Sequence, residues 1–151
     1  MSKINNIFCA GTMRTGGSLV SNLLSTHKDL LILTDIVHFF RYLYNKYNPI
    51  NRKANLYRLS AELSLRLKFR DDIKISEQAF YKKLCEDKVS NYSQVYSSIF
   101  KIILSEVPEK KMIGEYANAE WKSIGKFLRF NKNNVAIHVI RDPRGMLSSW
   151  K

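Results

Sequence analysis

The chain has 151 residues, of which 45% are hydrophobic, so it is long and apolar enough for one domain with a core and is not a mainly disordered polymer. Its 25 Lys and Arg residues outnumber 13 acidic residues, and the formal net charge of +12 predicts a positive field that attracts nucleic acid, acidic lipids or small polyanions. No apolar run approaches the about 20 residues of a membrane-spanning helix, and Cys9 and Cys85 are too few for a disulfide framework, so we expect a cytoplasmic protein with reduced thiols.

The amino-terminal part of the chain predicts a strand, a glycine-rich turn, a helix and a second strand. The apolar run in INNIFCAG ends at Gly11, which is typical of a buried strand that enters a tight turn. SLVSNLLSTH then places Leu19, Leu23 and Leu24 on one face of a helix, so the turn lies at a helix N-terminus, which favours an anion. LLIL at 30–33 is the second strand, and Asp35 follows its carboxyl end, where open α/β sheets place their ligands.

The middle of the chain, residues 38–107, is predicted to be helical and strongly basic, with turn-like interruptions at YNPIN and RDDIKIS. Ser76 is a candidate helix cap, and Ile75 and Phe80 have the spacing of a hydrophobic staple around it. In LSLRLKF the apolar residues alternate as in a strand. The spacing of Leu56, Leu59 and Leu63 is helical, however, and it extends into this segment, so we predict a helix.

Strand and helix alternate again in the last third of the chain. KKMIGEY predicts a strand, NVAIHVIR a further buried strand, and NAEWKSIGKFLRF between them a helix whose inward residues are Trp121, Ile124 and Leu128. RDPRGMLSSWK begins a last helix, which Asp142 can cap. The alternation indicates one α/β domain over residues 1–151 with a parallel sheet, and because the chain stops inside a helix we expect it to be incomplete at its carboxyl end.

The turn AGTMRTGGSL nearly matches the phosphate-binding loop G-x-x-x-x-G-K-[ST]. It supplies Gly11, Gly16 and Ser18, but Gly17 stands where the lysine belongs. Arg14 brings a guanidinium into the loop, which can hold a phosphate or sulfate with two hydrogen bonds while hydroxyl groups and backbone amides complete the site. The loop therefore predicts a site for a phosphate-like or sulfate-like anion.

Two motifs of the chain resemble those of the sulfotransferases that use 3′-phosphoadenosine 5′-phosphosulfate (PAPS). GTMRTGGSLVSNLLSTHKDL is similar to the family's phosphosulfate loop and first helix, G-x-x-R-S-G-[ST]-[ST]-L-L followed by a histidine, with His27 at the histidine. RDPRGMLSS is similar to the second signature, R-[DN]-P-[RK] followed by a serine, and supplies Arg141, Arg144 and Ser149. The resemblance implies a P-loop-like, three-layer α/β domain with a central parallel sheet.

The resemblance also implies the cofactor and the residues that bind it. PAPS would donate a sulfuryl group, without a metal, to a hydroxyl of a carbohydrate, peptide or small molecule. The 5′-phosphosulfate would be held by Arg14, Thr15, Gly16, Gly17 and Ser18. The 3′-phosphate would be bound by Arg141 and Ser149. Gly17 departs from the family, which usually has a hydroxyl residue at this position, so one hydrogen bond to the ligand is missing.

The acceptor hydroxyl needs a base when it attacks sulfur. In the carbohydrate and tyrosylprotein branches of the family a glutamate has this role, and the resemblance puts Asp35, one methylene shorter, at the matching position. Asp35 as base and Arg14 as the group that stabilises the leaving phosphate are the catalytic candidates. His38 is a second candidate base, and Glu115 a third, although it lies in IGEY where family members often have GEKTP.

Two other functions stay open at this point. A nucleotide kinase with an altered loop is the alternative enzyme, although Gly17 argues against it because a kinase uses the loop lysine on the terminal phosphates. A catalytically incomplete basic module that binds nucleotides or nucleic acid is an alternative of a different class. The second anion-binding motif favours a nucleotide donor and a hydroxyl acceptor as partners over nucleic acid.

Overall fold

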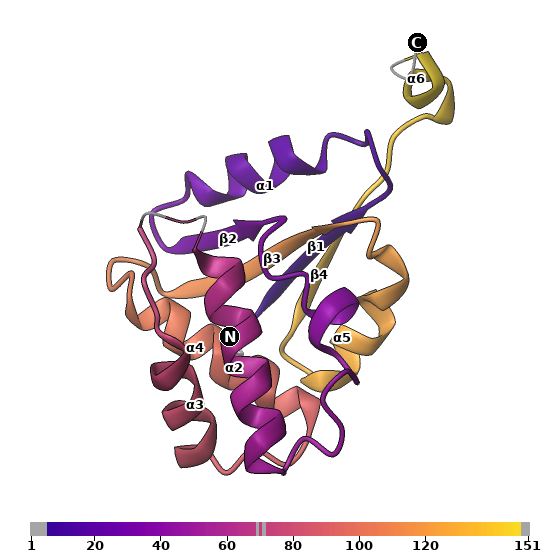
Figure 1. The fold of residues 1–151 in the computed structure, drawn as a ribbon. Helices are drawn as coiled ribbons and strands as arrows, with labels where there is room; N and C mark the ends of the chain where they lie inside the picture. Colours follow the sequence, from indigo (N-terminus) through magenta and orange to yellow (C-terminus); the bar gives the residue numbers. More distant parts are fainter. Residues whose placement is uncertain (1–5, 69, 71, 149–151) are drawn as a thin grey trace. The chain divides into compact units, whose positions relative to one another are not determined.

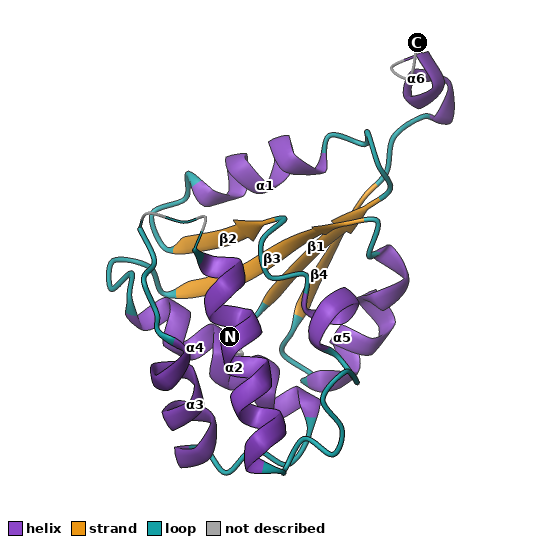
Figure 2. Ribbon diagram, in the orientation of Figure 1, coloured by secondary structure: helices purple, strands orange, loops and turns teal. Residues whose placement is uncertain are grey.

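The computed structural model describes residues 6–68, 70 and 72–148. They form two compact units: a sheet unit, residues 6–38 and 112–148, and a helical unit, residues 39–111. The sheet unit contains four parallel strands with helices packed on them (Figure 1, Figure 2). The α/β class and the parallel sheet predicted from the sequence are therefore confirmed.

The four strands of the sheet lie in the order β2-β3-β1-β4. Their bounds are Ile7–Gly11 for β1, Leu30–Thr34 for β2, Met112–Asn118 for β3 and Val135–Val139 for β4. Gly11 pairs in register with both Asn118 and Val139, so the carboxyl ends of β1, β3 and β4 are level. The loops that follow these three strands consequently begin at one edge of the sheet.

Two helices cover opposite faces of this sheet. Helix α1, Gly17–Ser25, packs its Leu24 against a cluster that includes Cys9 and Tyr116. Helix α5, Ile124–Phe130, packs Phe127 against Phe8, with ring centroids 5.2 Å apart. Because neighbouring residues of a strand point to opposite faces, Phe8 and Cys9 assign α5 and α1 to different faces. Burial also raises the pKa of the Cys9 thiol to about 12.

The connections between the strands create a switch point at the carboxyl edge. The chain leaves β1 through α1 to reach β2, and it leaves β3 through a short 3₁₀ turn, Trp121–Ser123, and α5 to reach β4. β1 and β3 are neighbours, yet the loops that follow them lead to helices on opposite faces. Such a divergence leaves a crevice between the two loops, which is where open α/β sheets bind ligands.

The face of α1 that packs on the sheet is only partly the one expected from its leucines, because Leu24 packs on the sheet but Leu19 and Leu23 do not. Leu19 and Leu23 are 65% and 61% exposed, whereas Gly17 and Ser21 are buried. The Ser21 hydroxyl hydrogen-bonds the Thr34 hydroxyl of β2 at 2.9 Å. The small residues Gly17 and Ser21 allow α1 to approach the sheet closely, while Leu19 and Leu23 stay exposed.

The predicted inward face of the helix after β3 is also wrong in part. Trp121 and Leu128 are exposed, Ile124 is partly buried, and Phe127 is the residue that enters the core. The 3₁₀ turn shifts the phase of the helix, and Trp121 instead stacks on His138 with ring centroids 6.1 Å apart. Strand β4 was expected to be buried, but it pairs only with β1 among the described strands and is partly exposed.

The helical unit confirms the helices predicted for the middle of the chain. It consists of a π-helical turn and three α-helices: Phe39–Leu43, then α2 (Lys53–Leu67), α3 (Glu77–Glu86) and α4 (Tyr92–Ser105). Ser76 caps α3, since its hydroxyl accepts a hydrogen bond from the Ala79 amide at 3.1 Å. LSLRLKF is helical as far as Leu67, with Leu63 and Leu67 buried and Leu65 exposed. No helix of the described residues is both long and apolar enough to cross a membrane.

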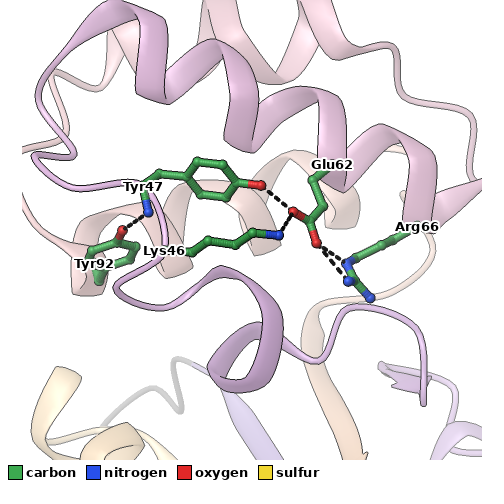
Figure 3. A network of polar contacts seen from close by, with 5 residues as sticks. All are labelled: Lys46, Tyr47, Glu62, Arg66 and Tyr92. Carbon is green, nitrogen blue, oxygen red and sulfur yellow. Dashed lines mark hydrogen bonds and ion pairs between the residues drawn. The ribbon is translucent and has the colours of Figure 1, made fainter.

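Glu62 on α2 is the centre of a polar network within the helical unit (Figure 3). Its carboxylate accepts hydrogen bonds from Lys46 at 2.6 Å, from Arg66 at 2.7 Å and from the Tyr47 hydroxyl. The Tyr47 amide in turn donates to the Tyr92 hydroxyl at 2.9 Å. Partial burial raises the pKa of Glu62, but the three donors outweigh it and bring the pKa down to about 2. The network links the segment before α2 to α2 and α4.

Glu62→Gln is expected to lower the free energy of unfolding at neutral pH by roughly 1–2 kcal/mol, because it removes the charge that three donors share. The pKa of Glu62 is about 2 in the folded chain against an ordinary value of 4.5, so this stabilisation is complete above pH 4.5 and is lost as the pH falls towards 2. Denaturant unfolding at pH 7 and pH 2.5 measures both effects. Glu86→Gln, whose exposed carboxylate lies 3.9 Å from Lys82, is the control and should change little at either pH.

Candidate functional site

A pocket of about 460 Å³ lies in the sheet unit, at the carboxyl ends of β1 and β3. It is lined by Arg14, Gly16, Gly17, Ser18, Tyr116, Asn118 and Arg141. Four of these residues belong to the loop after β1 and the start of α1, two to the end of β3, and one follows β4. The pocket therefore occupies the switch point of the sheet, and its two arginine side chains give it a positive charge.

The loop after β1 has a shape that its own residues fix. Arg14 and Gly16 have left-handed backbone conformations, with φ of 64° and 86°. The buried Thr15 donates its hydroxyl to the Thr12 carbonyl oxygen at 2.8 Å, so this side chain holds the loop and does not line the pocket. A Cβ atom at Gly11 would lie 2.7 Å from the Val139 carbonyl oxygen, which explains why glycine ends β1.

Helix α1 starts at the pocket without a side-chain cap. Gly16 occupies the N-cap position and has no side chain, while its carbonyl oxygen accepts the hydrogen bond of the Val20 amide at 3.0 Å. The first amide groups of a helix have no carbonyl partner within the helix, and the helix dipole adds partial positive charge there. Together with Arg14 and the exposed Ser18, this helix end is suited to an oxyanion.

The two sequence motifs meet at this pocket. Arg141 Nη1 donates to the carbonyl oxygen of Arg14 at 3.3 Å, across 127 positions of the chain. Arg144 does not line the pocket, and its guanidinium binds the Asp142 carboxylate at 2.6 Å. Asp142 also accepts from the Arg144 amide at 2.9 Å, which confirms that it caps α6, Pro143–Ser148. Ser149 lies outside the described residues.

Asp35 lies directly beyond β2 and is bonded to the end of β3. Its amide donates to the Tyr116 carbonyl oxygen at 2.9 Å, and its Oδ1 accepts from the Asn118 amide, also at 2.9 Å. His38 Nε2 is 3.5 Å from the same Oδ1. Asp35 and His38 both have left-handed backbone conformations, with φ of 52° and 47°. Asp35 does not line the pocket, but it accepts a hydrogen bond from Asn118, which does.

Glu115 lies on the other face of the sheet. It is fully buried in β3 and pairs in register with Phe8 and Leu33, whereas Tyr116 next to it belongs to the cluster under α1. A strand cannot direct two neighbouring side chains to the same face. Of the three candidate bases, Glu115 is consequently the one whose side chain lies on the face of the sheet opposite to Tyr116 and the pocket.

Sequence reasoning missed Tyr116 and Asn118 as pocket residues. The sequence pattern favoured Glu115 instead, because this residue has a carboxylate and lies in the segment that is compared with GEKTP. Two signals pointed to Tyr116. KKMIGEY was predicted as a strand, so its end had to lie at the same edge as the loop after β1, and the alternation of a strand separates Glu115 from Tyr116. Asn118 was predicted to begin the next helix, whereas β3 extends to it.

Two other features of the described residues bear on function: further pockets and groups of side chains that could bind a metal. Two further pockets, of about 410 and 300 Å³, lie in the helical unit and contain none of the predicted site residues. Within residues 6–68, 70 and 72–148, no group of three or more His, Cys, Asp or Glu side chains could hold a metal ion.

In comparisons with known proteins, no family model matches the chain and no curated sequence is significantly similar to it. Its function is therefore inferred from the residues of the pocket in the sheet unit and from the chemistry that they can perform.

Proposed function

We propose that this chain is a PAPS-dependent sulfotransferase with a P-loop-like α/β domain. The observation that carries the proposal is that Arg14 and Arg141, 127 positions apart, line one pocket together with the N-terminus of α1. A single phosphate needs only one of these two motifs. Two basic motifs beside one crevice suit a ligand with two separate anionic groups, such as a nucleotide that carries phosphates on both its 3′ and 5′ positions.

The donors of the pocket fit the anionic groups of such a nucleotide. Arg14, Ser18 and the first amides of α1 would hold the 5′-phosphosulfate, and Arg141 would hold the 3′-phosphate. Guanidinium groups bind phosphate and sulfate oxygens in pairs, and they keep their charge at any physiological pH. Fixed arginine charges and a helix dipole can stabilise a sulfuryl transfer without a metal, because sulfuryl carries less charge than phosphoryl.

When bound, PAPS would supply a sulfuryl group on a good leaving group. In the transfer, the acceptor oxygen would form a bond to sulfur as the bond from sulfur to the phosphate oxygen breaks, and adenosine 3′,5′-bisphosphate would leave. Arg14 stabilises the negative charge that develops on the leaving phosphate. Asp35 takes the proton of the acceptor hydroxyl, a role supported by its place beside Asn118 at the edge of the pocket.

Adenosine 3′,5′-bisphosphate is expected to bind the chain and to raise its melting temperature without magnesium. Ligand at 100 times its dissociation constant adds about 2.7 kcal/mol to the free energy of unfolding. Calorimetric titration and thermal unfolding, each with EDTA and with magnesium, measure this effect. An unchanged melting temperature at millimolar ligand contradicts the proposal. Magnesium-dependent ATP binding would instead indicate a kinase, and salt-sensitive DNA binding without nucleotide binding would indicate a nucleic-acid module.

A further inference from the structure

Gly17 is glycine because Tyr116 occupies the space of its side chain. A Cβ atom at position 17 would overlap the ring and the hydroxyl oxygen of Tyr116. At Gly16, one residue earlier, a Cβ atom would meet nothing within 4 Å, although the left-handed backbone favours glycine there. The two neighbouring glycines thus have different causes: backbone conformation at Gly16 and the Tyr116 side chain at Gly17.

The Tyr116 ring is held in place by the core of the sheet unit. The residue is only 3% exposed and packs in the cluster with Cys9, Ile32 and Leu24. Its backbone carbonyl accepts the Asp35 amide, which fixes the end of β3. The side chain nevertheless lines the pocket, so its polar end reaches the pocket from a buried and rigid base.

The Tyr116 hydroxyl is suited to donate a hydrogen bond to an anion. Burial raises the pKa of this phenol, and the Asp35 carboxylate and Cys9 raise it further, so the hydroxyl stays protonated at neutral pH. Among the described residues, the hydroxyl has no hydrogen-bond partner. A protonated phenol beside two arginines and a helix N-terminus adds a neutral donor where the positive charge attracts an oxyanion.

We propose that the Tyr116 hydroxyl binds an oxygen of the phosphate or sulfate group held at the N-terminus of α1, and so replaces the side-chain hydroxyl that Gly17 lacks. Gly17 and Tyr116 then act as a pair, in which the glycine makes room for a donor that comes from β3 instead of from the loop. This inference rests on the proposed function, because that function puts an oxyanion in the pocket. It names a ligand-binding residue that neither of the two sequence motifs contains.

Tyr116→Phe tests the proposal, since it removes the hydroxyl and keeps the ring. We expect about tenfold weaker binding of adenosine 3′,5′-bisphosphate in calorimetry, the scale of one hydrogen bond to a charged group, with an unchanged melting temperature of the free protein. Tyr96→Phe is the matched control, because Tyr96 is equally buried but belongs to α4 in the helical unit, and its ligand affinity should equal that of the unmodified chain.

A second measurement separates binding from packing. The protein is labelled with ¹³C at Cζ of tyrosine, and the NMR signal of Tyr116 is assigned through the backbone of residue 116. This signal should shift on addition of adenosine 3′,5′-bisphosphate. The ligand should also raise the pH at which the Tyr116 phenol ionises. An unshifted signal, or equal affinities of Tyr116→Phe and the unmodified chain, overturns the inference and leaves the proposed function standing.

Failure of the proposed function gives a different result. If the unmodified chain does not bind adenosine 3′,5′-bisphosphate, the same titration is made with inorganic phosphate and with sulfate. Chloride at equal ionic strength is the control. If phosphate or sulfate shifts the Tyr116 signal and chloride does not, Tyr116 is an oxyanion donor although the chain is not a sulfotransferase. No shift with either ion overturns both.

Discussion

Replacing Arg141 by alanine is expected to weaken the binding of adenosine 3′,5′-bisphosphate by roughly 30- to 150-fold. A guanidinium bound to a phosphate contributes about 2 to 3 kcal/mol, and each 1.4 kcal/mol is a factor of ten in affinity. The loss should be several times smaller for 5′-AMP, which has no 3′-phosphate. Calorimetric titration of both nucleotides against the unmodified chain and the variant gives the two ratios.

Two details of the structure refine this experiment. Arg141 Nη1 also donates to the Arg14 carbonyl oxygen, so part of the loss comes from a looser loop and affects both nucleotides. The difference between the two ligands therefore measures the contact with the 3′-phosphate. Arg144→Ala is the control: this arginine belongs to the same motif but is paired with Asp142, and its removal should change neither affinity by much. Equal losses for both nucleotides in Arg141→Ala would assign Arg141 to loop support alone.

The strands of the sheet were predictable because each is a short apolar run with a clear end. IFCAG stops at Gly11, where a side chain would collide with the Val139 carbonyl oxygen, and LLIL stops at Asp35, which turns into a left-handed conformation. Parallel pairing follows from the alternation of strand and helix, so the meeting of Arg14 and Arg141 at one edge was also predictable. Topology alone brings the two motifs together.

The faces of the helices were not predictable in the same way, because the apolar pattern was not the quantity that decided them. Leu19, Leu23 and Leu24 were expected to share the inward face of α1, but only Leu24 packs on the sheet, together with the buried Gly17 and Ser21. Tyr116 was missed for a related reason: its side chain fills the space beside Gly17, a residue 99 positions earlier in the chain, and no local pattern contains this relation. Such contacts follow from packing, which a sequence pattern does not specify.

The largest effect is expected for Asp35→Asn, which should lower the rate of sulfuryl transfer by roughly 10²- to 10⁴-fold, the usual scale for loss of a general base. Asparagine tolerates the left-handed backbone at this position, with φ of 52°, and its amide oxygen can still accept the Asn118 hydrogen bond. The variant therefore removes the proton acceptor with little change in structure. Its melting temperature and its affinity for adenosine 3′,5′-bisphosphate should match those of the unmodified chain.

Asp35→Ala separates the chemical role of Asp35 from its structural one. Alanine leaves the Asn118 amide without this acceptor and is strained at a positive φ, so this variant should also unfold at a lower temperature. The rate to measure is release of adenosine 3′,5′-bisphosphate from PAPS, with sugars and tyrosine peptides as hydroxyl acceptors. Undiminished turnover in Asp35→Asn would make Asp35 a structural residue and leave His38, 3.5 Å away, as the base to test, since Glu115 lies on the opposite face of the sheet.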